Sequence, residues 1–301
     1  MDETTLRTLL DSALADEPPI GPGADNALRA GIKLRRRRRV LTAALGVAVT
    51  VAIAVAIPVV TGPLGAPPTS GQHPASTGLN APANVPPPDK SVLWWPTLAK
   101  DRASIVKITG EAMTTCGRRV EGSGFAISPQ HVLTNAHVVA GMTRLHVGYG
   151  TSNVLPAKVV LFDSNTDVAI LYVPRLHASP LRFTGLAPLG SDAVVAGYPE
   201  NGGFRVVPAR VGSQWSANRP NSYQTRSVTR PIYAVRATVH PGSSGGPLLA
   251  KNGKVYGVIF AASSNARDTG FALTAGAVRD DVRAGAHATA SVSTHGCPSP
   301  G

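Results

Sequence analysis

From about residue 91 to near its end, the chain is built of short β-branched and apolar runs separated by Gly, Pro, Asn and Asp. Short runs bounded by such turn residues are typical of an antiparallel barrel or sandwich. Only the segment TAGAVRDDVRAGA, residues 274–286, has the periodicity of a helix. We therefore expect residues 91–301 to form one mostly β domain with a C-terminal helix.

The residues before this domain suggest export and anchoring. Residues 40–60 carry no charge, and at about 1.5 Å per residue they span about 31 Å, which matches a bilayer core. Five arginines, Arg35–Arg39, precede this run. They favour a single-pass transmembrane helix with residues 1–39 in the cytoplasm and the β domain outside the cell membrane. A cleaved signal peptide, with Ala54–Ala56 as the cleavage site, is the alternative.

The remaining features before residue 91 fit the same arrangement. Residues 61–90 contain eight prolines with much Gly, Ala, Ser and Thr, a composition that indicates a disordered linker. The formal net charge is +12, but the arginine block belongs to the membrane signal, so we expect no nucleic-acid partner. Cys116 and Cys297 are the only cysteines. An oxidising compartment favours a disulfide between them, and two free thiols are the alternative.

The segment HPGSSGGPLL, residues 240–249, places two adjacent serines among glycines. A serine that attacks an acyl carbon needs backbone N–H groups that bind the developing oxyanion, and neighbouring glycines permit the necessary turn. In the chymotrypsin arrangement the donors are the N–H of the serine and that of the residue two before it. Gly242 supplies an N–H for Ser244, whereas Pro241 has none to supply for Ser243. We therefore take Ser244 as the candidate nucleophile.

A nucleophilic serine needs a base and a group that orients the base. His137 lies in LTNAHVVAG, and Asp167 directly precedes the apolar run VAILYV. Asp163 is the alternative carboxylate. The chain order His, Asp, Ser is that of the chymotrypsin class. No histidine and acidic pair has a metal-binding spacing, so we expect neither a metal nor another cofactor.

Several segments together resemble one protein family. They are RRVEGSGFAIS, LTNAHVVAG, DVAIL, GYP, GSSGGPLL and DTGFALTA. The chain is similar to the trypsin-like serine proteases of the HtrA/DegP type, and in particular to the actinobacterial membrane-anchored periplasmic proteases of the MarP group. The resemblance covers about residues 100–299. Only a short tail follows the expected helix, so we expect no PDZ domain, and one anchor replaces the several transmembrane helices of the MarP group.

The resemblance implies a fold and a set of roles. The fold is a chymotrypsin-like pair of antiparallel barrels with the site between them. His137 is the general base, Asp167 orients it, Ser244 is the nucleophile, and the N–H groups of Gly242 and Ser244 form the oxyanion hole. The family also implies the Cys116–Cys297 disulfide. The function implied is extracytoplasmic cleavage of protein or peptide substrates, in envelope stress or protein quality control.

Further expectations concern specificity and control. We assign Thr238 and Pro241 to substrate binding, and Thr238 at the floor of the pocket predicts small to medium uncharged side chains before the scissile bond. Residues 213–230 are polar and predict a long regulatory loop that gates the oxyanion hole. An ordinary histidine predicts hydrolysis that weakens below about pH 6. A catalytically weak sensor or binding module that signals through the anchor is the alternative function.

Overall fold

The computed structural model describes residues 85–112, 119–149 and 154–296. The chain divides into two units, Met1–Ser70 and Gly71–Gly301, and every described residue belongs to the second. The predicted cytoplasmic segment, the transmembrane helix, nearly all of the linker and both cysteines lie outside the described residues. Among the residues that are described, no helix is long and apolar enough to cross a membrane.

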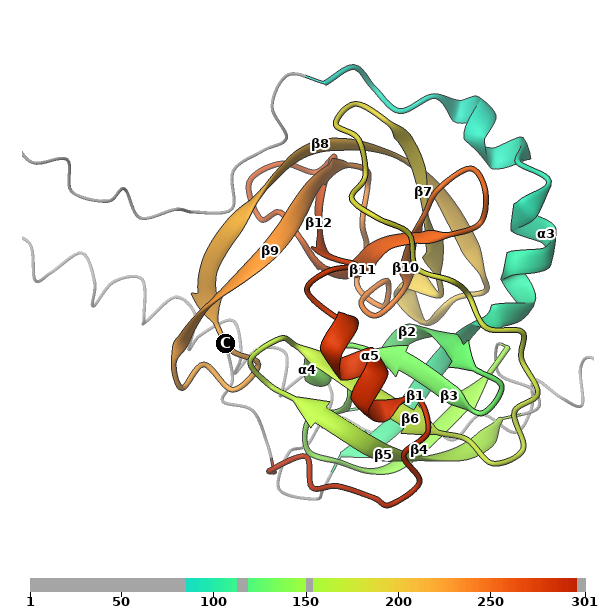
Figure 1. Cartoon of the computed structure of the whole chain (residues 1–301), viewed down its shortest axis with the longest axis vertical. Helices are drawn as coiled ribbons and strands as arrows, with labels where there is room; N and C mark the ends of the chain where they lie inside the picture. The colour runs from blue at the N-terminus through green and yellow to red at the C-terminus, as the bar shows by residue number, and fades with distance from the viewer. Residues whose placement is uncertain (1–84, 113–118, 150–153, 297–301) are drawn as a thin grey trace, which may run out of the picture. The chain divides into compact units, whose positions relative to one another are not determined.

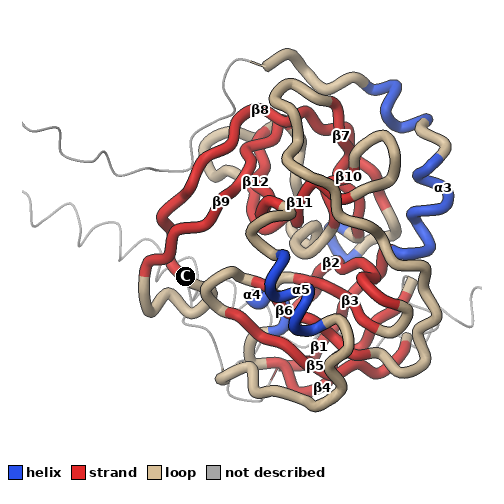
Figure 2. Tube along the Cα trace, viewed as in Figure 1, coloured by secondary structure: helices blue, strands red, loops and turns tan. Residues whose placement is uncertain are grey.

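The described part is mostly β, as predicted, with a few short helices (Figure 2). Six strands close the first barrel in the order β1-β2-β3-β6-β5-β4, and six close the second in the order β10-β11-β12-β9-β8-β7. All pairings within the barrels are antiparallel. The expected chymotrypsin-like double barrel is therefore confirmed. The strands are β1 (Ile105–Ala112), β2 (Arg119–Ser128), β3 (His131–Thr134), β4 (Met142–Gly148), β5 (Leu155–Asp163), β6 (Val168–Tyr172), β7 (Asp192–Gly197), β8 (Arg205–Pro220), β9 (Ser227–Arg236), β10 (Pro247–Leu249), β11 (Val255–Ala262) and β12 (Thr269–Thr274).

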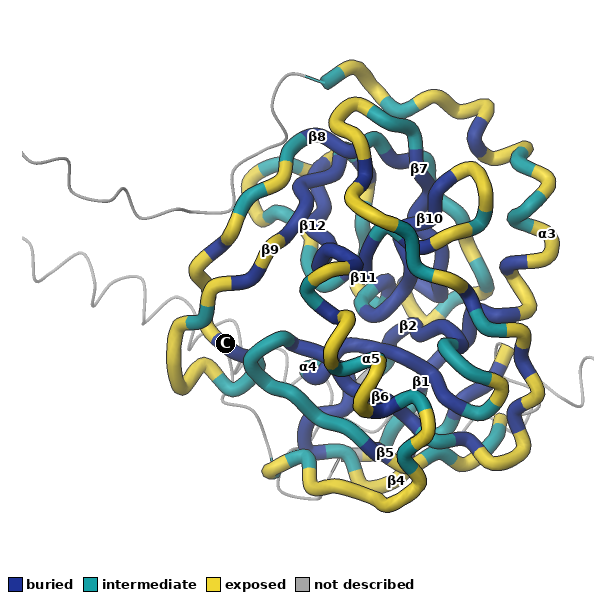
Figure 3. Tube along the Cα trace, viewed as in Figure 1, coloured by how far each residue is buried: buried dark blue, intermediate teal, exposed yellow. Residues whose placement is uncertain are grey.

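The apolar runs seen in the sequence form the two barrel interiors. Val132 and Leu171 are fully buried in the cluster of the first barrel, and Tyr233 and Ile259 in that of the second. A third cluster, which includes Phe125 and Phe271, joins residues of both barrels. Buried segments follow the strands, whereas exposed segments follow the connections and the end of the β8–β9 hairpin (Figure 3). Closing each sheet on itself pairs all its edges, which leaves the loops at the rims free to carry a site.

The helices are short and lie at the ends and junctions of the barrels. They are η1 (Lys90–Trp94), α3 (Thr97–Asp101), η2 (Arg102–Ser104), α4 (Ala136–Val139), η3 (Pro199–Asn201) and α5 (Arg279–Gly285). The segment with η1 and α3 runs along the second barrel before the chain enters the first, and α5 leaves the second barrel and covers the first (Figure 1). Residues 85–90, which we expected in the linker, contact the domain, since Arg236 donates a hydrogen bond to the carbonyl of Val85.

Two sequence predictions need correction. The expected loop over residues 213–230 is wrong, because most of it lies in β8 and β9, which pair from Arg210 with Arg236 out to Pro220 with Ser227. The expected helix over residues 274–286 is too long. Its first residue, Thr274, ends the buried strand β12, and α5 begins only at Arg279. In both cases pairing with a neighbouring strand decided the structure.

Candidate active site

His137 and Asp167 lie side by side because two strands of the first barrel pair. Thr134 at the end of β3 pairs with Ala169 near the start of β6 in antiparallel register. The segments that follow β3 and precede β6 therefore meet at one edge of the sheet. His137 Nδ1 lies 2.8 Å from Asp167 Oδ2, and the backbone N–H of His137 donates to Asp167 Oδ1 at 3.0 Å. Two hydrogen bonds thus fix the imidazole relative to the carboxylate.

Asp167 is held from both barrels. Asp167 is buried, with 4% of its surface exposed. Its backbone φ is 65°, a left-handed conformation that Asp tolerates better than most residues. Asn135 Nδ2 donates to the Asp167 carbonyl at 2.9 Å. Ser222 Oγ donates to Asp167 Oδ1 at 2.6 Å. Because Ser222 lies in the turn between β8 and β9, the second barrel helps to position an acid of the first.

The alternative carboxylate, Asp163, has a different environment. It accepts hydrogen bonds from the backbone N–H groups of Asn165 and Thr166 and from the Thr166 hydroxyl. These bonds close the turn between β5 and β6. Asp167, and not Asp163, is the carboxylate that contacts His137.

The pKa values of the pair shift in opposite directions. Burial alone would lower the pKa of His137, but the charge and hydrogen bond of Asp167 outweigh it, and the pKa of His137 rises above its ordinary value. Burial alone would raise the pKa of Asp167. The charge of His137 and the hydrogen bonds from His137 and Ser222 outweigh that effect, so the pKa of Asp167 falls. Asp167 therefore stays ionised and favours the imidazolium form of its partner.

Ser244 lies at the start of the segment that leads into β10. Its carbonyl accepts a hydrogen bond from Ser123 N–H at 2.8 Å, which ties the segment to β2 of the first barrel. Its hydroxyl donates to the Phe260 carbonyl at 3.5 Å, a long contact. Within the described residues, no hydrogen bond joins the Ser244 hydroxyl to the His137 imidazole. The structure thus brings the base and the acid together, and it leaves the serine hydroxyl turned to the carbonyl of β11.

The peptide between Pro241 and Gly242 has a fixed orientation. The Pro241 carbonyl accepts a hydrogen bond from Glu200 N–H at 2.8 Å. In a trans peptide the C=O and N–H point in opposite directions, so the Gly242 N–H points away from Glu200. In the described part of the chain, neither this N–H nor that of Ser244 donates a hydrogen bond. Both are available to an incoming oxygen.

Gly242 cannot be replaced by a larger residue without distortion. Its φ is 89°, and a Cβ at this position would come within 2.7 Å of the Tyr198 carbonyl. The Gly242 carbonyl accepts a hydrogen bond at 2.7 Å from Ser123 Oγ, which itself accepts from Tyr198 N–H at 2.8 Å. The fully buried Ser123 therefore fixes both the Gly242 and the Ser244 carbonyls.

A buried lysine supports the turn that holds Pro241. Glu200 and Asn201 in η3 have φ values of 53° and 55°, a conformation that L-residues adopt at an energetic cost. Lys107 of β1 is 2% exposed, and its Nζ donates to the Asn201 carbonyl at 3.0 Å and to Asn201 Oδ1. Glu121 Oε2 lies 3.9 Å from the same Nζ. Lys107 thus stabilises the turn whose Glu200 N–H orients the Gly242 peptide.

No sequence pattern pointed to Ser123, Lys107 or Ser222. Ser123 lies in the motif RRVEGSGFAIS, and Lys107 is a single cation in an apolar run. Each acts through a partner more than fifty residues away along the chain. No local pattern could have revealed such contacts.

The two residues assigned to substrate binding, Thr238 and Pro241, do not line the cavity that contains His137 and Asp167. Thr238 is exposed and lines a cavity of about 290 Å³ together with Pro87, Pro88 and Lys90, and this cavity does not include His137 or Asp167. Pro241 is exposed, and its carbonyl is engaged by Glu200. A different cavity, of about 610 Å³, is lined by His137 and Asp167. Cys116 and Cys297, proposed to pair, lie outside the described residues, and the described ones hold no group of three or more His, Cys, Asp or Glu suited to a metal ion.

Comparison with known proteins gives the family. A model of the trypsin-like peptidase domain matches residues 122–258. The crystal structure of the active form of the Rv3671c protease from Mycobacterium tuberculosis superposes with a TM-score of 0.70 at 42% sequence identity, covering 74% of this chain and 98% of that one. The chain belongs to the trypsin-like serine proteases. The inactive form of the same protease superposes with a TM-score of 0.60, covering 67% of this chain and 98% of that one.

Among curated trypsin-like relatives, serine protease Rv3671c of Mycobacterium tuberculosis (strain ATCC 25618 / H37Rv) is 43% identical over 217 residues, which is 71% of this chain and 54% of the relative. The chain therefore spans about half the length of that relative. The HtrA-type protease AlgW with a tripeptide has a TM-score of 0.55 at 21% identity, covering 64% of this chain and 62% of that one, which is a likeness of fold.

Proposed function

We propose that this chain is a serine endopeptidase that cleaves peptide bonds of protein substrates through an acyl-enzyme. Two observations carry the proposal: the hydrogen bond between His137 and Asp167, and the unengaged backbone N–H groups of Gly242 and Ser244. The similarity to a protease whose active form superposes with a TM-score of 0.70 supports it.

The chemistry follows from these atoms. His137 Nδ1 donates to Asp167 Oδ2, which leaves Nε2 to accept the Ser244 proton as Oγ attacks the substrate carbonyl carbon. The carbonyl oxygen gains negative charge, and the N–H groups of Gly242 and Ser244 stabilise it. His137 then transfers the proton to the leaving nitrogen as the C–N bond breaks. A water molecule, deprotonated by His137, releases the acyl group and restores Ser244.

We also propose the cellular setting. The uncharged run at residues 40–60 behind the arginine block supports a single-pass anchor in the cell membrane, with the barrels outside the cytoplasm. This location agrees with a role in envelope stress or protein quality control. Alkaline extraction of membranes, with the full chain and with a variant that lacks residues 40–60, tests the anchor. We expect only the full chain to stay with the membrane pellet.

One observation favours the alternative function, a catalytically weak sensor or binding module. The Ser244 hydroxyl contacts the Phe260 carbonyl and not the imidazole. Hydrogen bonds between catalytic residues often tighten only when substrate binds, so a Ser244 hydroxyl that does not contact the imidazole is compatible with catalysis. The two functions differ in whether Ser244 reacts.

A fluorophosphonate probe distinguishes them. We expect it to label the full chain and to fail on Ser244→Ala. The neighbouring variant Ser243→Ala is the matched control and should label as the wild type does, because the hydrogen bonds of Ser243 within the described residues are made by its backbone. A folded wild-type protein that neither labels nor hydrolyses casein would establish the sensor function instead.

A further inference from the structure

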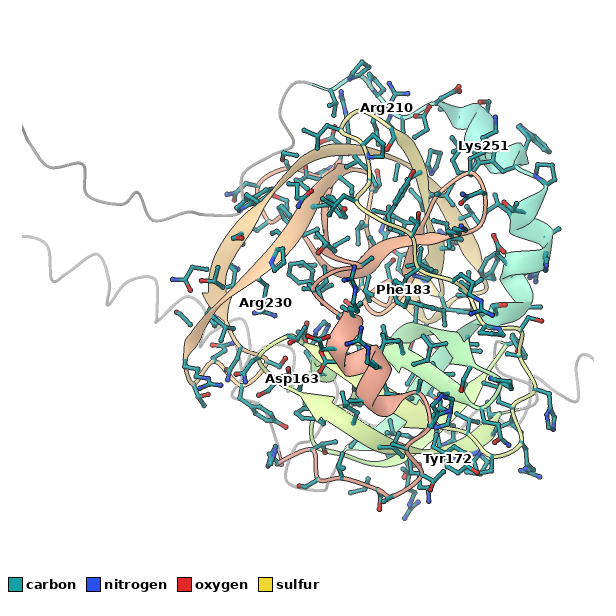
Figure 4. The ribbon with its side chains drawn as sticks, in the orientation of Figure 1. Asp163, Tyr172, Phe183, Arg210, Arg230 and Lys251 are labelled. Atoms are coloured by element: carbon teal, nitrogen blue, oxygen red, sulfur yellow. The ribbon has the colours of Figure 1, made fainter. Side chains whose placement is uncertain are left out.

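The cavity of about 610 Å³ beside His137 has an unusual charge. Its lining includes two arginines, Arg219 and Arg230, and one carboxylate, that of Asp167. Asp167 is already engaged by His137 and Ser222. Figure 4 shows Arg230 between β9 and the first barrel, with Asp163 on the opposite side. The side chain of Asp163 is in turn occupied by the turn that follows β5.

Arg230 is a buried cation without an acidic partner. The residue is 8% exposed, and in the described part of the chain no carboxylate lies within ion-pair distance of its guanidinium. It makes one hydrogen bond, from Nη2 to the Pro220 carbonyl at 2.6 Å. A guanidinium has five N–H donors and stays protonated even when buried. A buried charge that lacks a partner is costly to folding, so the remaining donors of Arg230 are suited to a ligand that enters the cavity.

Arg219, on the neighbouring strand β8, adds a second positive charge to the lining of the cavity. Ala217 on β8 pairs with Arg230 on β9, so Arg219 lies two residues further along β8 toward the turn. Arg219 is exposed, and among described residues it too lacks an ion pair. Burial lowers the pKa of Arg230 and the charge of Arg219 lowers it further, whereas Asp167 and Asp163 raise it. Two like charges on one wall give the cavity a positive potential that the partly neutralised Asp167 does not offset.

We propose that this cavity binds an acidic side chain of the polypeptide substrate, a few residues from the scissile bond. The inference rests on the proposed function, since it defines the substrates of the same site. Arginine matches a carboxylate with two parallel hydrogen bonds, which gives preference for Asp or Glu over the neutral amides. The position of the acid before or after the scissile bond is an outcome of the experiment.

Matched peptides test this proposal. In a fluorogenic series, Asp or Glu replaces Asn or Gln at each position on either side of the scissile bond, and kcat/KM is measured for every acid and amide pair. We expect the acid to be favoured about tenfold at one position. Arg230→Gln and Arg219→Gln should reduce that ratio toward one. Arg267→Gln, which removes an exposed arginine outside the cavity, should leave it unchanged.

The ratio separates specificity from general damage, because a partly unfolded variant loses activity on both peptides of a pair. Arg219→Glu, at an exposed site that tolerates the change, should make a lysine peptide better than its glutamine counterpart. Equal rates for acids and amides in the wild type, or a preference that survives both arginine variants, would overturn the proposal.

Binding tests the inference even if the enzyme does not turn over. Fluorescein-labelled forms of the same peptides are titrated into Ser244→Ala, and the acid-to-amide affinity ratio is compared with that of Ser244→Ala/Arg219→Gln. We expect the ratio to exceed one in Ser244→Ala and to fall toward one when Arg219 is also replaced. Failure of the proposed function would appear as absent Ser244-dependent labelling, whereas failure of this inference would appear as binding without preference for the acid.

Discussion

The two barrels share one strand order but contribute to the site in different ways. In the first barrel, a single pairing of β3 with β6 is enough to place His137 against Asp167. In the second, the Gly242–Ser244 segment takes its geometry from the first barrel, through Ser123, and from η3, through Glu200. One half of the site therefore forms within a barrel, and the other half requires contact between barrels.

The long hairpin shows the same dependence in the opposite direction. β8 has 16 residues and β9 has 10, and their connecting turn places Ser222 on Asp167. The second barrel thus completes the hydrogen bonds to the acid of the first. Substitutions within one barrel and at contacts between the barrels should separate these contributions. The expected effects decrease from the first substitution below to the last.

The largest effect is expected from the pair inside the first barrel. Asp167→Asn should lower kcat about 10⁴-fold, because an amide at this position favours the wrong imidazole tautomer. Asp163→Asn is the matched control and should change kcat far less, since Asp163 only closes the β5–β6 turn. Steady-state hydrolysis of a peptide measures both. An equal loss for Asp163→Asn would mean that the orienting role has been assigned to the wrong carboxylate.

A smaller loss is expected from the contact between barrels. Lys107→Met should lower kcat about 100-fold with little change in KM, because the unsupported Asn201 turn no longer orients the Gly242 N–H. Lys107→Arg should recover part of the loss. Lys158→Met, at an exposed lysine of the same barrel, is the control.

Affinity for a peptide aldehyde, compared with the matched alcohol, distinguishes oxyanion stabilisation from a general loss of structure. Only the aldehyde forms a tetrahedral adduct with an oxyanion. If Lys107→Met weakens both compounds alike, Lys107 does not act through the oxyanion hole.

Ser222→Ala should lower kcat about tenfold. The variant removes one hydrogen bond to an ionised carboxylate and leaves the two from His137 in place. Ser216→Ala, an exposed serine of the same hairpin, provides the baseline. A wild-type rate for Ser222→Ala would mean that the first barrel orients Asp167 unaided.

The pH dependence follows from the raised pKa of His137. Only the neutral imidazole can accept the Ser244 proton, so activity should rise with pH through that pKa. The acid limb of kcat/KM should lie above pH 6.5, later than an ordinary histidine would place it. A rate profile flat down to about pH 4 would exclude His137 as the base.

The smallest effect is expected on stability. Burial and the charge of Asp163 raise the pKa of Asp281 on α5 to about 6. A carboxyl whose pKa is raised by folding destabilises the protein once it ionises, so this penalty grows as pH increases from about 4 to about 6. Asp281→Asn should raise the free energy of unfolding by about 1–2 kcal/mol at pH 7 and by little at pH 4. Urea titrations at both values, with the exposed Asp280→Asn as reference, measure it.

Whether a feature could be predicted from the sequence depends on how far apart in the chain its contacting residues lie. Strand positions depend on short local motifs, and most of those predictions agree with the structure. The structure also brings His137 and Asp167 into contact, while the catalytic roles assigned to them stay a prediction. The polar sequence of residues 213–220 did not indicate a strand, because in that part of β8 only Ala217 is buried and the backbone depends on β9 for its hydrogen bonds. Ser123 and Lys107, which support the Gly242 segment, could not be recognised from the sequence because their partners lie far away in the chain.

The two ends of the described chain cross over to opposite barrels. Val92 of η1 packs into the core with second-barrel residues, and Thr97 donates to the Lys251 carbonyl. At the other end, Gly285 of α5 lies against Ile170, and His131 of β3 contacts the Ala288 carbonyl. The first barrel is synthesised early, but its surface around Ile170 and His131 is covered only once the final segment has been made. The packing between the barrels is therefore completed only when nearly the whole domain has been synthesised, and the candidate site, which needs contacts from both barrels, is among the last features to form.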